Sequence, residues 1–370
     1  MPQSSTLSIG MEVHNDTMAV ASVAKAPDAE VVFLGTGGTR HGDRDQLLRQ
    51  IPSKANHRIF VYEAGPCGAW LSRYLRNKGH DGWVVAPSLI PPKPGDRVNT
   101  DRRDAVPWAR LARSGALTAV YVPKGADEAR RDLPRAREDA IRELTDAKLR
   151  LKAFVRRHDS RYTGRAPWGP AHLRWLSEVV GQTPAQQLVF PEDVRAVTEH
   201  TARLQRLEQE VQAHVKAGRL SPVVAALQAW RGVPCTGAVT LVAEMGDLTR
   251  VQSPRALMKC MGLMPSEYAS GEPRRQGAMT KAGTTPARRV LVEGAWADRS
   301  PAKISRHWPR RLDTQPHVIQ DISWKAHVRR CKRYRRLVAR GNQAKVVTVA
   351  MARELTGFLG AMATQVPVSA

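Results

Sequence analysis

Apolar residues in the first part of the chain recur at the spacing of strands in a sheet. Leu7, Ile9, Met11 and Val13 occupy alternate positions, which predicts a strand at the start of the chain. A turn signal and a second run of small and apolar residues follow, and they predict a returning strand. Further short apolar runs predict three more strands, so that the full set is 7–13, 18–23, 30–34, 58–63 and 82–86.

Helical spacing separates the later strands. The pattern predicts helices over 43–51 and 68–77, and a further helix that starts near Thr100 with Asp101 in its first turn. Three strands followed by alternating helix and strand match the order of a ribonuclease H-like fold. We therefore predict an α/β domain over residues 1–124.

The middle of the chain, residues 125–219, is predicted to be helical. A charged helical run covers 128–158, where Pro134 should kink or interrupt the helix. A short helix is expected around Trp175, and a longer one follows. That longer helix carries an apolar stripe at three- and four-residue steps, which fits either a coiled coil or a stripe that faces the core of one chain. The stripe consists of Val194, Val197, Thr201, Leu204, Leu207 and Val211.

The last part of the chain, residues 220–370, is predicted to be mainly α-helical. Residues 220–297 have the pattern of a compact helical region. The segment 299–345 holds 14 Lys or Arg against two acids, Asp313 and Asp321. A final apolar helix over 346–363 is expected to pack back on this domain.

The charge of the whole chain is strongly positive, since 58 Lys and Arg face 34 Asp and Glu and the formal charge is +24. Such an excess indicates a polyanionic partner held by phosphate contacts and counterion release. The alternative is an arginine-rich composition inherited from a high-GC genome. The basic segment 299–345 also interleaves cations with aromatic residues, which favours phosphate contact over a merely solvated face.

The cysteines and the termini indicate a protein of the cytoplasm. Cys67, Cys235, Cys260 and Cys331 form no CxxC pair, so we expect them to be reduced and structural. The N-terminus has neither a basic region nor a long apolar region of a signal peptide. No run of about 18 apolar residues is present, so no membrane span is expected.

Four acids occupy positions that suit a metal site. Glu12 lies on the first predicted strand, Glu63 ends a later one, and Asp101 and Asp104 lie three apart at a helix start, on one face. The two strands are neighbours in a ribonuclease H-like sheet, so the four carboxylates can converge. Their repulsion is relieved by Mg²⁺ or Mn²⁺, and two such ions can stabilise both oxygens of a phosphodiester exchange.

Each acid also has a simpler explanation. Glu12 can be an edge or surface residue, and Asp101 can serve only as a helix cap. Asp104 can pair with Arg102 or Arg103. The argument for a metal site therefore depends on the four acids as a set.

A second candidate for chemistry is the glycine-rich, basic segment 262–289, which contains Ser266 and Ser270. A serine in such a loop can approach a phosphate closely and attack phosphorus if a base or a metal removes its proton. A phosphate-binding loop without a covalent role fits the spacing at least as well.

Several stretches together resemble the transposase family named after insertion sequence 110, which includes pilin-gene invertases. The resemblance rests on IGMEVHNDT, VYEAGPCGAWLSRYL, VAPSLIPPKPGDRVNTDRRDA and GLMPSEYASGEPRRQGAMTKAG, and on ISWKAHVRRCKRYRRLVARGNQ followed by ARELTGF. These motifs are long, keep their order, and extend over residues 7–363.

The resemblance implies an N-terminal RuvC-like domain of the ribonuclease H superfamily, with an Asp-Glu-Asp-Asp metal site that falls on Glu12, Glu63, Asp101 and Asp104. It implies a middle coiled-coil segment used in assembly of a dimer or tetramer. A nucleophilic serine in the C-terminal domain falls on Ser270, with Ser266 less favoured.

The same resemblance implies a covalent phosphoserine link to DNA. It also implies a structured guide RNA that pairs with donor and target DNA, in a bacterial protein of the nucleoid. Phosphate contacts would then come from basic residues near these motifs. We list them as Arg102, Arg103, Arg274, Arg275, Lys281, Arg288, Arg329, Arg330, Lys332 and Arg333.

The chain departs from the family pattern at a few positions. Glu12 stands where the family has Asp, and Asn99 stands where it has Lys. The segment 232–237 resembles a Gly-rich hairpin of the family, although a plain helix–helix turn fits equally well. Two other functions remain open on this basis: a RuvC-like nuclease or junction resolvase that uses water, and a nucleic-acid-binding copy that has lost catalysis.

Overall fold

The computed structural model divides the chain into two compact units, Met1–Gly125 (unit 1) and Ala126–Ala370 (unit 2). Each unit is described by itself. The residues that the structure describes are 6–51, 55, 57–65, 69–90, 100–217, 221–251, 253–269, 274–303 and 312–366.

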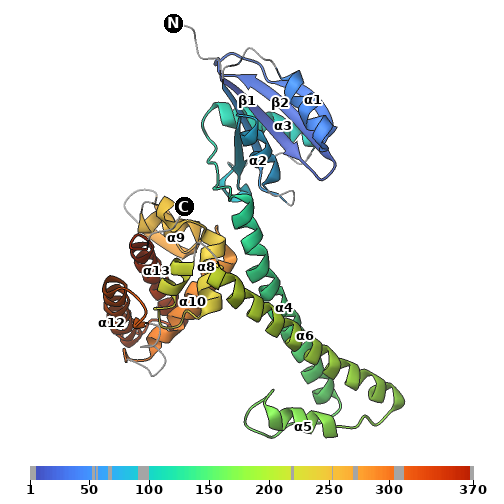
Figure 1. Cartoon of the computed structure of the whole chain (residues 1–370), viewed down its shortest axis with the longest axis vertical. Helices are drawn as coiled ribbons and strands as arrows, with labels where there is room; N and C mark the ends of the chain where they lie inside the picture. Colours follow the sequence, from blue (N-terminus) through green and yellow to red (C-terminus); the bar gives the residue numbers. More distant parts are fainter. Residues whose placement is uncertain are drawn as a thin grey trace. The chain divides into compact units, whose positions relative to one another are not determined.

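Unit 1 is built on a five-stranded sheet with the strand order β3-β2-β1-β4-β5 (Figure 1). The first three strands are antiparallel neighbours, whereas β1, β4 and β5 run parallel. The predicted adjacency of the first strand and the strand that ends in Glu63 is thus confirmed. The strands are β1 (Thr6–Val13), β2 (Thr17–Ala24), β3 (Val32–Gly38), β4 (His57–Glu63) and β5 (Asp81–Val85).

The two faces of the sheet differ in side-chain size, because successive residues of a strand point to opposite faces. Ile9, Met11, Phe60 and Tyr62 are large and pack in one apolar cluster with residues of the first two helices. On the opposite face, small residues of β2 pack with Ala105 and its neighbours in the third helix. The helices are α1 (His41–Gln50), α2 (Trp70–Asn77) and α3 (Asp101–Arg113), with a short 3₁₀ turn η1 (Pro87–Leu89) after β5.

Gly10 allows α3 to lie directly against the middle of β1. A Cβ atom at Gly10 would lie 2.3 Å from both the Ala105 carbonyl oxygen and the Ala109 backbone nitrogen. These are backbone atoms, so they cannot rotate away. The absence of a side chain at Gly10 therefore fixes the distance between the sheet and the helix that carries Asp101 and Asp104.

Replacement of Gly10 with Ala is expected to lower the free energy of unfolding by at least about 1–3 kcal/mol, the usual cost of overpacking. Gly42→Ala on α1 is the matched control, because no heavy atom lies within 4 Å of its added Cβ. That change should be neutral or stabilise the helix by up to about 1 kcal/mol. Urea unfolding followed by tryptophan fluorescence measures both, and equal midpoints for the two variants would contradict the packing argument.

The third strand differs from its prediction. It runs over Val32–Gly38, whereas 30–34 was predicted. Gly35, Gly37 and Gly38 have low strand propensity, but their backbone pairs with β2, and Gly35 has a φ of +114° beside a register shift at Val20/Ala21. Backbone pairing therefore extends the strand beyond the apolar residues from which it was predicted.

Two long helices and a short one form the first part of unit 2: α4 (Gly125–Arg157), α5 (Pro170–Glu178) and α6 (Pro184–Ala217) (Figure 1). Leu151 and Phe154 of α4 share an apolar cluster with Phe190 and Val197 of α6. Ion pairs also join the two helices, including Arg137 Nη2 to Glu208 Oε1 at 2.6 Å. Within this chain, the stripe of α6 is therefore a core-facing stripe.

Pro134 was predicted to kink or interrupt the helix; it does not interrupt it, since α4 continues through this position. Proline removes one backbone donor and crowds the preceding turn, which makes this position unfavourable in an isolated helix. Here Pro134 is buried, and packing of the helix offsets that cost.

The rest of unit 2 is mainly helical, but it also contains a two-stranded hairpin. Its apolar core includes Trp230, Leu241, Met351 and Leu355. The elements are α7 (Ser221–Leu227), α8 (Cys235–Met245), η2 (Leu248–Arg250), α9 (Pro254–Cys260), β6 (Pro265–Ala269), β7 (Arg274–Met279), α10 (Thr285–Ala295), η3 (Trp296–Arg299), α12 (His317–Ala339) and α13 (Ala344–Ala363).

The last helix, α13, packs on the body of unit 2 as expected. Of the described helices, it alone is long and apolar enough to pass a length-and-composition test for a membrane span. Half of the window that passes the test is buried inside the protein. Met351, Leu355 and Leu359 belong to the core of unit 2, which is the pattern of a core helix.

Candidate active site

Glu12 and Glu63 lie side by side on the face of the sheet that α3 covers. The parallel register pairs Met11 of β1 with Tyr62 of β4, so the next residue on each strand is an acid. Met11 and Tyr62 point into the large apolar cluster. By strand alternation, the two acids point the other way.

Helix α3 presents its own acids to the same place. Thr100 is the N-cap, and its side chain accepts a hydrogen bond from the Arg103 backbone nitrogen at 3.4 Å. Asp101 is therefore not the N-cap, although it lies in the first turn, where the helix dipole favours an acid. Asp101, Asp104 and Trp108 follow at three- and four-residue steps, so they share one helix face.

Three of the acids influence one another's ionisation: Glu12, Glu63 and Asp104. The pKa of Glu12 is raised, first by burial and then by the charges of Asp104 and Glu63, while a hydrogen bond from Trp108 opposes the rise. The pKa of Glu63 is also raised, by burial and by Asp104. Asp104 acts on both glutamates, so it is the common neighbour in this group.

Two further residues belong to this group, although no role was predicted for them from the sequence. Trp108 Nε1 donates a hydrogen bond to Glu12 Oε2 at 3.1 Å. His14 Nε2 lies 3.2 Å from Asp101 Oδ1 and 4.0 Å from Glu12 Oε1. The available signal was spacing: His14 follows Glu12 by two residues, and Trp108 follows Asp104 by one helical turn.

The acids converge but are not in ligand-to-ligand contact. Among the described residues, no three of their oxygen atoms come within 4.8 Å of one another. Repulsion between neighbouring carboxylates accounts for this spacing. A group of oxygen donors that repel each other, on one sheet face, fits a hard divalent cation.

The serine segment is a β-hairpin rather than the loop that its glycines suggested. Strands β6 and β7 pair in antiparallel register, from Pro265 with Met279 to Ala269 with Arg274. Ser270 directly follows β6 and lies outside the described residues. Ser266 lies within β6, and a Cβ atom at Gly277 would come within 2.4 Å of its Oγ, so this hydroxyl faces the partner strand.

Arg288 anchors the base of this hairpin, so its prediction as a nucleic-acid contact is wrong. The side chain is buried, and Nη1 donates to the carbonyl oxygens of Met261 and Lys281, both at 3.1 Å. These two carbonyls precede β6 and follow β7. Arg288 thus joins the two strands at the base of the hairpin, and its buried side chain is engaged within the protein.

The prediction of Arg330, in helix α12, as a nucleic-acid contact is also wrong. Arg330 is fully buried and donates from Nη2 to Asp298 Oδ1 at 3.2 Å, so it cannot contact nucleic acid. Arg329 and Arg333 are more exposed, but both pair with Glu354 of α13. Their charges are therefore partly neutralised within the protein.

Five of the remaining predicted contacts are exposed, and the role of all six stays a prediction. The Arg274 side chain lies outside the described part of the chain. The exposed members are Arg102, Arg103, Arg275, Lys281 and Lys332.

A buried cluster in unit 2 also has the residue types of a metal site. Ligand atoms of Asp298, His327 and Cys331 lie within 4.8 Å of one another. Arg330 already donates to Asp298, and Arg231 Nη1 lies 3.4 Å from His327 Nε2. Two guanidinium groups against the cluster disfavour a further cation, so we interpret it as a packing network. Burial lowers the pKa of His327 to about 4, which keeps its ring neutral.

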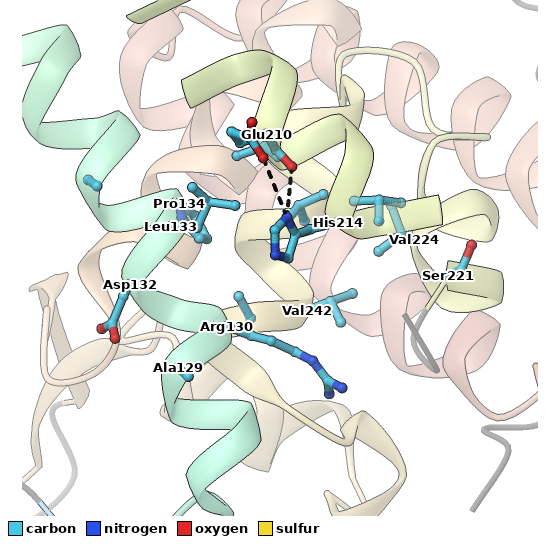
Figure 2. Close-up of a pocket in the computed structure, with 15 residues that line it drawn as sticks. Ala129, Arg130, Asp132, Leu133, Pro134, Glu210, His214, Ser221, Val224 and Val242 are labelled. Carbon is cyan, nitrogen blue, oxygen red and sulfur yellow. Dashed lines mark hydrogen bonds and ion pairs between the residues drawn. The ribbon is translucent and has the colours of Figure 1, made fainter. Parts of the chain in front are cut away.

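Figure 2 shows a pocket of about 540 Å³ in unit 2, lined by residues of α4, α6, α7 and α8. Its walls are mainly apolar, and Glu210 and His214 form an ion pair at 3.9 Å in one of them. Arg130 also lines the pocket, but it pairs with Asp127 at 2.7 Å. None of the predicted site residues lines this pocket, and its surface does not suit phosphoryl chemistry.

In the segment 232–237, residues 232–234 end the turn between α7 and α8, and residues 235–237 begin α8. Gly232 has a φ of +90°, and a Cβ atom there would lie 2.4 Å from the Gly294 carbonyl oxygen of α10. Close packing against α10 therefore explains why position 232 is a glycine. This agrees with the alternative of a plain helix–helix turn.

Comparison with known proteins gives matches along most of the chain. Residues 9–158 match a family model of DEDD transposases of the IS110 type, and residues 224–307 match the model described as the transposase IS116/IS110/IS902 family. A putative transposase of Sinorhizobium fredii, y4qE, is 41% identical over 96% of this chain and 88% of its own length.

More distant relatives have the same description. The transposase for insertion sequence element IS1533 of Leptospira borgpetersenii is 26% identical over 89% of this chain and 96% of its own length. The transposase for element IS1111A of Coxiella burnetii is 22% identical over 87% of this chain and 85% of its own length.

Proposed function

The chain belongs to the IS116/IS110/IS902 family of transposases, and on that premise we propose that it cuts and rejoins DNA through a divalent metal site and a serine nucleophile. The family implies a ribonuclease H-like fold for the N-terminal part, and the sheet order agrees with it. The observation that carries the proposal is the convergence of Glu12, Glu63 and Asp104 on the face of the sheet beneath α3.

Glu12, Glu63, Asp101 and Asp104 are the residues that would hold the metal. Transposases with a DEDD site generally use a divalent metal, and these four side chains offer oxygen donors, which Mg²⁺ and Mn²⁺ prefer. When bound, the metal supplies charge stabilisation to the oxygens of the phosphodiester exchange. Trp108 orients the Glu12 carboxylate through its hydrogen bond.

Ser270 is proposed as the nucleophile. Its hydroxyl oxygen forms a bond to phosphorus as the bond from phosphorus to the 3′-oxygen breaks, and the hydroxyl proton passes to the departing 3′-oxygen by way of solvent or a base. A new 3′-hydroxyl then attacks the same phosphorus, and the serine oxygen leaves and recovers a proton. Arg288 holds together the base of the hairpin whose first strand Ser270 follows.

The partners follow from the same proposal. DNA is the substrate, and a structured RNA from the same element would supply sequence recognition by base pairing while basic residues hold the backbones. Residues 125–219 would serve in assembly of a dimer or tetramer, and residues 220–370 would carry the serine and basic region. We place the protein in the bacterial cytoplasm, on the nucleoid.

Metal removal is the direct test of the proposed function. The protein is incubated with the genomic DNA that flanks its coding sequence and RNA transcribed from that DNA. Cleavage is expected in Mg²⁺ or Mn²⁺, complete loss with a chelator, and recovery when metal is restored. A fully active protein in excess chelator would contradict the metal site.

The same metal is expected to raise the thermal midpoint of unit 1 in a pH-dependent way. A ligand at about one hundred times its Kd adds roughly 2.7 kcal/mol to stability. Because the folded-state pKa values of Glu12 and Glu63 lie above the ordinary 4.5, protons displace the metal at a higher pH than they would from ordinary glutamates.

The metal-induced rise in the thermal midpoint is expected to depend on pH in one direction. As the pH falls from 7 toward 5, protonation stabilises the folded metal-free protein and weakens metal binding, so the metal-induced rise in midpoint should shrink. Differential scanning fluorimetry with and without Mn²⁺ measures it. A rise that begins to shrink only below pH 4.5 would contradict the raised pKa values.

A further inference from the structure

Most cations of helix α12 belong to one of two groups that the sequence does not distinguish. The helix contains seven Lys or Arg against a single acid, Asp321. Arg330 is committed to Asp298 in the core, and Arg329 and Arg333 are committed to Glu354. These three therefore hold α12 against the rest of unit 2.

The second group faces solvent along the C-terminal half of the helix. Lys332 and Arg336 are exposed, as is Arg340 at the C-cap. Within the described part of the chain, no acid pairs with any of the three. They lie four residues apart, so they form one row with an axial spacing of about 6 Å.

Interactions within the protein explain only part of this row. Like charges at four-residue spacing destabilise a helix. The helix dipole favours a cation only in the last turn, which accounts for Arg336 and Arg340 but not for Lys332. Arg335 adds a further exposed cation beside the row, with its Nε bonded to the Cys331 carbonyl oxygen.

We propose that the row of Lys332, Arg336 and Arg340 is a binding site for successive phosphates of a nucleic-acid backbone. The unpaired charge and the regular spacing fit a linear polyanion, and the overall charge of +24 fits the same partner. The site deepens the proposed function and rests on it, because a DNA-rejoining enzyme must hold backbones while its acids and serine act. A DNA duplex and an RNA duplex offer the same phosphate chemistry.

The test measures the salt dependence of binding by the full chain. The variant replaces the row with glutamine, which keeps helix propensity and removes three charges. A matched control removes three exposed cations of α4 that have no acidic partner among the described residues. The variant is Lys332→Gln/Arg336→Gln/Arg340→Gln, and the control is Arg150→Gln/Lys152→Gln/Arg156→Gln.

Fluorescence anisotropy with a labelled DNA duplex and an RNA duplex of equal length gives the affinity at several salt concentrations. Each lost phosphate contact lowers the slope of log K against log salt by about 0.9 on duplex DNA. We expect the row variant to lose about two to three such contacts on one duplex type, and the control to keep the wild-type slope. The duplex type that shows the loss identifies the source of the phosphates.

Three outcomes decide the matter. An equal loss of slope in row variant and control would show that only total charge matters and would overturn the site. Unchanged binding by the row variant would also overturn it, even if the wild type binds and cleaves DNA as proposed. Binding of the row to vesicles with anionic lipid, but to neither duplex, would assign it to a membrane surface and overturn it too. Failure of the proposed function is read separately, from cleavage in Mg²⁺.

Discussion

Replacement of Asp104 with Asn is expected to abolish DNA cleavage while it leaves unit 1 at least as stable as the wild type. Burial raises the pKa of both Glu12 and Glu63, and the charge of Asp104 raises both further, so Asp104 interacts with both glutamates. The loss of a metal that supplies several kcal/mol of charge stabilisation, at about 1.4 kcal/mol for each tenfold, corresponds to a rate reduction on the order of 10³-fold.

A measurement of stability distinguishes loss of the metal site from misfolding of the Asp104→Asn variant. Asparagine has nearly the shape of aspartate but no charge, so it relieves repulsion with the two glutamates. The thermal midpoint without metal should therefore stay equal or rise. Asp28→Asn, in an exposed turn after β2, removes one aspartate charge elsewhere in unit 1 and should change neither cleavage nor midpoint.

Two other results of these cleavage assays would contradict the proposed role of the acids. An Asp104→Asn protein that cleaves at more than about a tenth of the wild-type rate would remove Asp104 from the metal site. An inactive wild type that becomes active with Glu12→Asp would favour a decayed copy of the element. In that case the longer Glu12 side chain, held by Trp108, would be the defect.

The N-terminal fold was predictable because its signals are local. Alternation at Leu7, Ile9 and Met11 sets the face of β1, and it also places Glu12 on the opposite face. The apolar strand that ends in Glu63 carries the same information for β4. The convergence of the acids was therefore implicit in side-chain parity and strand order.

Other features depend on distant contacts and could not be predicted in this way. From the sequence, Gly10 is an ordinary glycine in a strand, and its role is visible only in its contact with α3. The polar, glycine-containing β6–β7 hairpin has little strand propensity and is defined by backbone pairing and by Arg288 at its base. Pro134 persists in α4 because tertiary packing offsets its local cost.

Arg330 shows a case where a closer sequence reading would have helped. It lies in a run of cations that look alike, and composition alone predicted a surface residue. Yet Ser323, His327, Arg330 and Tyr334 recur at three- and four-residue steps and are all buried. Helical periodicity therefore separates Arg330 from Lys332, which is exposed.

Replacement of Ser270 with Ala is expected to remove the covalent protein–DNA adduct completely. Alanine has no oxygen to bond to phosphorus, so the adduct should fall below detection on a denaturing gel, and strand rejoining should be lost with it. Ser266→Ala is the matched control, because its hydroxyl faces Gly277 across the hairpin. That variant should keep the adduct within a few-fold of wild type.

The pattern of cleavage in these variants decides between the two enzymatic functions. A serine recombinase loses both adduct and cleavage in Ser270→Ala, because the serine makes the first bond to phosphorus. A nuclease that uses water keeps metal-dependent nicking in this variant and never forms an adduct. Since Asp104→Asn abolishes cleavage under either mechanism, only the serine variants show which oxygen attacks. An adduct that survives in Ser270→Ala but disappears in Ser266→Ala would move the nucleophile to the first strand of the hairpin.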